Sequence, residues 1–126
     1  KQPDGIVAVD TKKCIGCGYC VVACPYRQRT VNEKQSGYFA AKGLTKLEQQ
    51  GYQQHQRGTV TKCNFCQARV TQGKLPACVT ACPAKARLFG DLADPASEPS
   101  RALGRYSAYR LLPGLNTEPA VYYIPE

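Results

Sequence analysis

The sequence predicts an α+β fold in which short strands and short helices surround bound groups instead of a large apolar core. The 126-residue chain is 43% hydrophobic, with no Trp, no Met and only three Phe, so apolar burial alone would give a thin core. Its eight cysteines stand in two groups of four, and a six-residue segment is repeated between the groups. We therefore expect groups bound by the cysteines to supply the stabilisation that apolar residues lack.

The first expected element is a strand over residues 5–10, where apolar residues alternate weakly. It leads into the first cysteine group, which has the spacing C-x2-C-x2-C-x3-C-P. The members of this group are Cys14, Cys17, Cys20 and Cys24. Glycines in the loop let its backbone approach a bound group closely and adopt positive φ. The residues expected to surround that group are Ile15, Gly16, Gly18 and Tyr19.

A short helix is expected from Cys20 to Cys24, and Pro25 ends it because proline cannot continue the helical hydrogen-bond ladder. The sequence CVVACP at residues 20–25 returns almost unchanged as CVTACP at residues 78–83. Such an internal repeat fixes the architecture before finer detail is considered. It predicts a second short helix that carries a cysteine at its start and another at its end.

The second cysteine group has the spacing C-x2-C-x11-C-x3-C-P. Its members are Cys63, Cys66, Cys78 and Cys82. The residues expected to surround the group bound there are Asn64, Phe65 and Ala77.

Eight cysteines admit disulfides, zinc or iron–sulfur clusters. The first group occupies only eleven residues, so disulfides within it would close strained loops. Zinc commonly takes two well-separated pairs of ligands, which this crowded group does not offer. The same group has the spacing of bacterial ferredoxins, in which the fourth cysteine ligates the other [4Fe-4S] cluster. The sequence therefore favours a bacterial ferredoxin-like fold around [4Fe-4S] clusters, and a zinc-stabilised binding module is the less favoured alternative.

We expect residues 1–95 to form the cluster-binding domain. Residues 26–58 are a polar insert within it, with a helix over residues 45–56. A strand over residues 87–92 should end in a turn, and the prolines at positions 95 and 99 should break regular structure after it. Residues 96–126 then form a C-terminal extension with a short closing strand, packed on the core or on a partner subunit.

The formal net charge of +8 restricts the partners. Basic side chains offset the negative charge of clusters ligated by thiolates, and the rest of the charge serves docking. The chain has no aromatic-basic motif of a nucleic-acid-binding module, so we expect no nucleic-acid partner. It also has no apolar run of the length that spans a bilayer, so we expect no direct membrane span.

The motifs around the cysteines resemble the iron–sulfur electron-transfer subunit of the membrane-associated molybdopterin oxidoreductases, which include the polysulfide, tetrathionate, arsenate and dimethyl sulfoxide reductases. The resemblance covers residues 4–95 and a tail at residues 117–124. Its strongest segments are KCIGC at 13–17, ACPY at 23–26, KCNFC at 62–66, PACV at 76–79 and FGDLADP at 89–95.

The resemblance implies a chain without catalytic residues, which relays single electrons between a molybdopterin-containing catalytic subunit and a quinone-linked membrane subunit. It implies a membrane-associated complex at the periplasmic face of a bacterial cytoplasmic membrane, although some members of the family remain cytoplasmic. A free two-cluster soluble ferredoxin is the alternative, and the insert and the extension argue against it because a free ferredoxin needs neither.

Members of that family usually carry four cysteine groups, and the two groups here resemble the third and fourth. We therefore expect this chain to be the C-terminal half of such a subunit. In the four-group family, the family's first group shares cluster ligands with its fourth group, and its second group shares them with its third. In a self-contained two-cluster fold, Cys82 would instead complete the cluster of the first group and Cys24 that of the second. All eight cysteines are ligands under both schemes.

Overall fold

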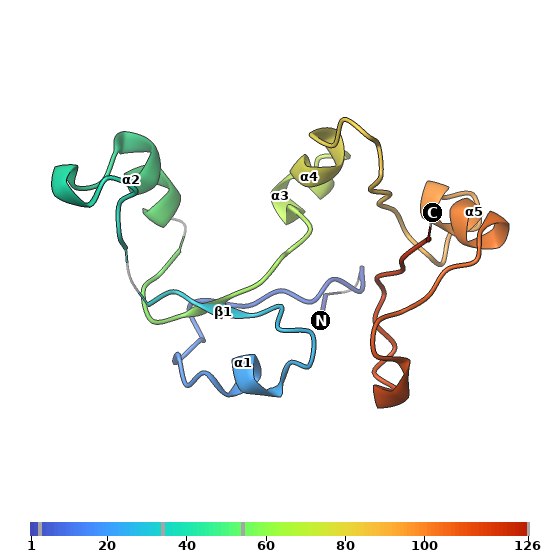
Figure 1. Cartoon of the computed structure of the whole chain (residues 1–126), viewed down its shortest axis with the longest axis horizontal. Coiled ribbons are helices and arrows are strands. Elements are labelled where there is room, and N and C mark those ends of the chain that lie inside the picture. Colours follow the sequence, from blue (N-terminus) through green and yellow to red (C-terminus); the bar gives the residue numbers. More distant parts are fainter. Residues whose placement is uncertain (3, 34, 54, 126) are drawn as a thin grey trace. The chain divides into compact units, whose positions relative to one another are not determined.

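A computed structural model describes residues 1–2, 4–33, 35–53 and 55–125. The chain forms two compact units, residues 1–65 and residues 66–126. Figure 1 shows the elements in chain order. Both units are built from short elements joined by long connections, as the spacing of the motifs predicts.

The first unit holds the first cysteine group and the polar insert. Its elements are α1 (Tyr19–Ala23), β1 (Thr30–Val31), the 3-10 helix η1 (Ala40–Lys42), α2 (Lys46–Gln53) and β2 (Val60–Thr61). The two strands pair antiparallel, with Thr30 opposite Thr61 and Val31 opposite Val60. In Figure 1 the blue segment that carries α1 runs below β1. The β1–β2 pair therefore joins the two ends of the polar insert, next to the first cysteine loop.

Helix α2 lies in the polar insert and confirms the helix expected over residues 45–56, except that it ends at Gln53; Gln54 lies outside the described residues. Thr45 and Glu48 form a capping box at its start: the Glu48 carboxylate accepts the Thr45 N–H at 2.6 Å, and the Thr45 hydroxyl accepts the Glu48 N–H at 3.3 Å. The other carboxylate oxygen accepts the Tyr38 N–H at 2.6 Å. These three hydrogen bonds fix the start of the helix at the position that the sequence predicts.

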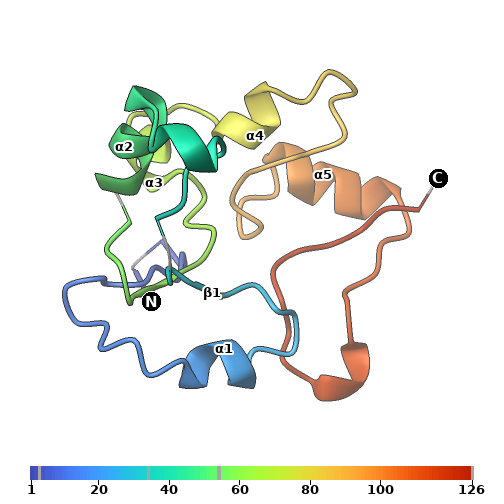
Figure 2. The ribbon, with the colours of Figure 1, turned by 60° about the vertical axis from the view of Figure 1, so that its left-hand side comes forward.

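The second unit contains α3 (Gln67–Val70), α4 (Ala77–Thr80), α5 (Glu98–Arg105) and the 3-10 helix η2 (Pro113–Leu115). Figure 2 shows α5 leading into the tail of the chain. Within that tail, Tyr109 and Tyr123 form an isolated antiparallel bridge with both N–H to O distances at 2.9 Å. Their rings stack with centroids 5.6 Å apart. The bridge replaces the short closing strand that the sequence predicts.

The prediction of strands at residues 5–10 and 87–92 is wrong. Among the described residues the one ladder joins β1 to β2, so neither segment has a partner strand to satisfy its backbone. Instead, the Gly5 N–H donates to the Gln2 carbonyl and the Gln2 N–H donates to the Ile6 carbonyl, both at 2.9 Å. The turn expected at the end of residues 87–92 is present, since the Ala93 N–H donates to the Asp91 carboxylate at 2.9 Å.

The apolar core is as thin as the composition predicts. Val60 and Pro76 are the buried apolar residues in the described part of the chain; Val60 has 1% of its surface exposed, and the neighbouring Thr59 is 2% exposed. Many large side chains remain in contact with solvent, including Ile15 at 87% and Leu47 at 79%. The first unit therefore has its tightest packing where β2 passes the first cysteine group.

Candidate metal centre: two cysteine groups

The first cysteine loop takes its shape from two glycines. Gly16 and Gly18 both have a φ of +71°, a conformation that residues with a Cβ adopt only at a cost. A Cβ on Gly16 would lie 2.0 Å from the carbonyl oxygen of Gly58, whereas one on Gly18 would meet nothing within 4 Å. Gly18 is the residue that caps the start of α1. The loop thus runs directly against the end of the polar insert.

The cysteines of this loop differ in exposure. Cys14, Cys20 and Cys24 are partly buried and Cys17 is exposed. The Cys14 sulfur accepts a hydrogen bond from the backbone N–H of Val60 at 3.4 Å. The expected neighbours Ile15 and Tyr19 are exposed, at 87% and 77%. No close packing against the rest of the described chain therefore keeps these two side chains away from a bound group.

The sequence repeat is also a structural repeat. Both predicted short helices are present as α1 and α4, and each begins one residue before its first cysteine, at Tyr19 and Ala77. After the last cysteine of each repeat, the same turn follows. The Arg27 N–H donates to the Cys24 carbonyl at 3.1 Å with φ +52°, and the Lys85 N–H donates to the Cys82 carbonyl at 3.2 Å with φ +50°. The sequence reasoning missed the role of these two basic residues, although their equal spacing after each Cys-Pro pair marks them.

The turn after Cys24 also stabilises the charged form of that cysteine. The backbone N–H of Gln28 lowers the pKa of the Cys24 thiol, with further lowering by the N–H groups of Tyr26 and Arg27 and by the positive charge of Arg29; partial burial opposes them. Because the thiolate is the form that binds metal, this turn prepares Cys24 to act as a ligand.

The second cysteine group has the same kind of local support. The Cys63 sulfur accepts the N–H of Phe65 at 3.4 Å. Phe65 and Cys66 both lie in the left-handed region, with φ of +57° and +52°, and Cys66 caps the start of α3. Such strained backbone at non-glycine residues is concentrated at functional sites. Asn64 is exposed and lies in the turn between the first two cysteines of this group.

The long connection between Cys66 and Cys78 is closed by Arg69. Its side-chain Nε donates to the Leu75 carbonyl at 2.9 Å, and its own carbonyl accepts the Lys74 N–H at 3.0 Å. The loop then enters α4 through Pro76, which is buried and stands just before Ala77. Cys78 is exposed and Cys82 is partly buried. Sequence reasoning gave Arg69 no role of its own, and these bonds make it a positioning residue for the loop.

The donor set and its surroundings fit a cluster of several irons. None of the eight cysteines is in a disulfide, and the Cys14 and Cys63 sulfurs each accept a backbone N–H. Across the residues that the structure describes, no three His, Cys, Asp or Glu side chains form a site for one metal ion. A [4Fe-4S] cluster is held by four cysteines, which is the number in each of the two groups.

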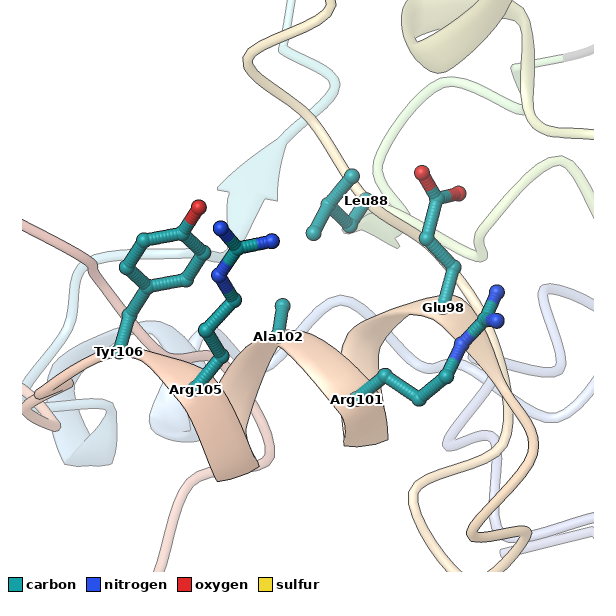
Figure 3. Close-up of a pocket in the computed structure, with 6 residues that line it drawn as sticks. All are labelled: Leu88, Glu98, Arg101, Ala102, Arg105 and Tyr106. Carbon is teal, nitrogen blue, oxygen red and sulfur yellow. The ribbon is translucent and has the colours of Figure 1, made fainter.

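The second unit has a pocket along α5. It is an open hollow of about 370 Å³ along α5, and Figure 3 shows its lining residues, which are Leu88, Glu98, Arg101, Ala102, Arg105 and Tyr106. The Arg105 guanidinium lies over the Tyr106 ring, 5.4 Å from its centroid. Leu88 and residues of α5 with its C-terminal neighbour Tyr106 form the hollow, and no cysteine lines it.

Two sequence profiles match the chain. The profile of a 4Fe-4S binding domain matches residues 6–29, and that of a 4Fe-4S dicluster domain matches residues 48–92. Each match contains one complete cysteine group. Together with the eight cysteines, they identify the cofactor as [4Fe-4S] clusters and decide against the zinc alternative. In the described part of the chain, no helix has the length and apolar character needed to cross a membrane.

Curated relatives align with nearly the whole chain. A sulfite dehydrogenase subunit of Allochromatium vinosum is 41% identical over 132 residues, which cover 99% of this chain and 46% of the relative. Protein NrfC of Escherichia coli is 42% identical over 122 residues, covering 96% and 45%. A tetrathionate reductase subunit of Salmonella typhimurium is 38% identical over 126 residues, covering 98% and 42%. The chain therefore spans less than half the length of the curated relatives it matches.

Proposed function

We propose that this chain, which belongs to the ferredoxin-type iron–sulfur subunits of reductase complexes, relays single electrons between a molybdopterin-containing catalytic subunit and a quinone-linked membrane subunit. The observation that carries the proposal is the pair of cysteine groups, each inside a 4Fe-4S profile match, in a chain related along its length to subunits of a dehydrogenase and a reductase. When bound, a [4Fe-4S] cluster supplies reversible uptake of one electron. No catalytic residue is assigned to the chain.

The ligands of the clusters are, in this proposal, the eight cysteines. Ile15, Gly16, Gly18 and Tyr19 surround one cluster, and Asn64, Phe65 and Ala77 surround the other. The backbone has two tasks at these sites. It holds the sulfurs at fixed positions through the loop and turn geometry, and it directs N–H groups at the Cys14 and Cys63 sulfurs. Hydrogen bonds to sulfur and nearby charge are the means by which a protein sets a cluster's potential.

We propose the four-group assignment of shared ligands, in which the two groups of this chain do not complete each other's clusters. The curated relatives are more than twice as long as the chain, which leaves room for further groups. The test compares Cys17→Ser with Cys82→Ser in the holoprotein by paramagnetic resonance. The two variants should perturb different cluster signals. Loss of the same signal in both would support the self-contained scheme instead.

The C-terminal extension, residues 96–126, packs on the core or on a partner subunit in this proposal. Its exposed apolar side chains support this role, since the surface of a soluble monomeric protein rarely exposes so many apolar side chains in a short segment. They are Tyr106, Tyr109, Leu111, Leu112, Leu115, Val121, Tyr123 and Ile124. The variant Leu112→Asp/Leu115→Asp should weaken copurification of a partner if the face binds one. If the face packs on the core, the same variant should lower the stability of the chain itself.

We place the complex at the periplasmic face of a bacterial cytoplasmic membrane, with the cytoplasmic face as the alternative. The names of the relatives, which are subunits of a dehydrogenase and a reductase, support assembly with a catalytic partner. Purification of the holoprotein from its native membrane through a tag on this chain tests the proposal. A molybdopterin protein and a membrane protein should copurify, and added quinol should bleach the visible absorption of the clusters. A chain that purifies alone and accepts electrons only from soluble donors would be a free ferredoxin.

A further inference from the structure

We infer that the backbone N–H of Val60, which lies outside the first cysteine group, sets the reduction potential of the cluster bound through Cys14. This inference rests on the proposed function. It assigns to the polar insert a task that its composition does not suggest: returning the chain so that β2 lies against the metal centre. The donor is separated from its acceptor by 46 residues of sequence, so the insert's folded length decides whether the bond exists.

The direction of the Val60 N–H follows from the strand pairing. Val60 stands opposite Val31 in the two-residue ladder, and its N–H donates not to β1 but to the Cys14 sulfur at 3.4 Å. In an antiparallel pair, residues of a non-hydrogen-bonded pair turn their backbone groups away from the partner strand. The register of β1 and β2 thus presents this N–H to the cysteine loop.

The segment before Val60 is held on both sides. The Gly58 N–H donates to the Asn32 carbonyl at 2.8 Å, and the Asn32 N–H donates to the Thr59 carbonyl at 2.9 Å. The Thr59 hydroxyl donates to the Gln56 carbonyl at 2.6 Å. With these bonds made, the Val60 amide has little freedom to turn away. The donor is preorganised before any electron arrives.

The cysteine loop meets this segment at van der Waals distance. A Cβ on Gly16 would stand 2.0 Å from the Gly58 carbonyl oxygen and 3.2 Å from the carbonyl carbon, so only glycine permits the approach. Thr59 and Val60 are 2% and 1% exposed, and a hydrogen bond away from water is electrostatically stronger than one in water. Close approach and burial together make the Val60 N–H an effective donor to the sulfur.

The consequence for the potential has a definite sign. One-electron reduction adds negative charge to the cluster and its thiolates, and an N–H donor stabilises the more negative state. Removal of the Val60 N–H should therefore lower the potential of the cluster that Cys14 holds. The cluster of the second group, whose sulfurs have other donors, should keep its potential.

The test replaces the Thr59–Val60 amide by an ester in the holoprotein, by incorporating the α-hydroxy acid of valine at position 60. The ester removes the N–H and keeps the side chain. Redox titration followed by paramagnetic resonance measures each cluster, and the signal lost in Cys17→Ser identifies the cluster of the first group. Two controls are matched to the change. An ester at Gln49 removes a backbone donor of the same insert that is directed at the Thr45 carbonyl and not at sulfur, and Val60→Ile keeps the N–H.

A lower potential of the first cluster in the Val60 ester alone, with the second cluster and both controls unchanged, supports the inference. An unchanged potential in that variant overturns it while leaving the electron-transfer proposal intact. Wild-type protein with no cluster signals would overturn both. If the ester variant does not fold, ¹⁵N-valine labelling of the wild type replaces it: a ¹⁵N coupling to the reduced first cluster that disappears in Val60→Ile supports the inference, and its absence contradicts it.

Discussion

The contact between the cysteine loop and the insert can be isolated by comparing two glycines. Gly16 and Gly18 have the same φ of +71°, but only at Gly16 would a Cβ meet another atom, the Gly58 carbonyl oxygen at 2.0 Å. Alanine at either position costs about 1–2 kcal/mol for the left-handed backbone. Gly18→Ala therefore measures the conformational cost alone, and Gly16→Ala measures that cost plus the clash.

The size of the clash follows from the distance. An ordinary contact begins at 3.4 Å, so at Gly16 the loop and the Gly58 segment must separate by about 1.4 Å. Such a shift is large enough to break the bond from Val60 to Cys14, now 3.4 Å long, which contributes about 1 to 1.5 kcal/mol. Gly16→Ala should thus destabilise the site by about 1.5 kcal/mol more than Gly18→Ala, roughly tenfold in a local opening equilibrium.

The assay is the rate of chelator-driven loss of the first cluster's paramagnetic signal, which follows local opening of the loop. Gly16→Ala should lose the signal about ten times faster than Gly18→Ala, and both should lose the second cluster at the wild-type rate. Equal rates in the two variants, or a faster loss in Gly18→Ala, would refute the argument because the Gly58 contact would then have no energetic weight.

Three further outcomes are expected. The N–H of Tyr38 and the N–H and hydroxyl of Thr45 hold the pKa of Glu48 below its usual value, so the stabilisation of α2 is complete above the unfolded pKa and is lost as the pH falls through the folded one. The protection factor of the Thr45 amide, which is its exchange rate corrected for the intrinsic pH dependence, should fall at acid pH in the wild type and not in Glu48→Gln. A wild-type protection factor that does not change with pH would contradict this expectation. Ser97→Ala removes the cap that accepts the Ser100 N–H at the start of α5 and should cost about 1 kcal/mol, seen as about fivefold faster exchange in α5 but not in α2. Removal of iron by chelation should unfold the cysteine loops together with cluster loss, and an apoprotein with an unchanged cooperative melt would contradict the dependence of the fold on its clusters.

Local signals account for the parts of the fold that the sequence predicts. The repeated CVxACP segments predict α1 and α4, and Thr45 with Glu48 marks the start of α2. Helix α5 is not among the expected elements, because Pro99 is expected to break regular structure. Proline fits the first turn of a helix, where its missing N–H has no partner to lose, and Ser97 just before it is a preferred N-cap residue. The same residues therefore predict a helix once the prolines are placed at its start.

Long-range features could not be predicted in the same way. Strands β1 and β2 have two residues each, too few for an alternating pattern, and they form because the insert brings residues 30–31 and 60–61 together. The hydrogen bond from Val60 to Cys14 depends on that pairing. The residues next to Val60 in the sequence do not predict it. The strands expected over residues 5–10 and 87–92 failed for the opposite reason. Their patterns are suitable, but no partner strand reaches them among the described residues.

The binding of [4Fe-4S] clusters by both cysteine groups can be measured through the metal and sulfide content of the anaerobically purified protein, combined with paramagnetic resonance of Cys17→Ser. Iron and acid-labile sulfide should each be present at about eight per chain, from two clusters' worth of ligands. Cys17→Ser should lose or convert one cluster signal and retain the other. Zinc at about two per chain without sulfide, or two unchanged cluster signals in Cys17→Ser, would contradict the assignment of the cysteines as cluster ligands.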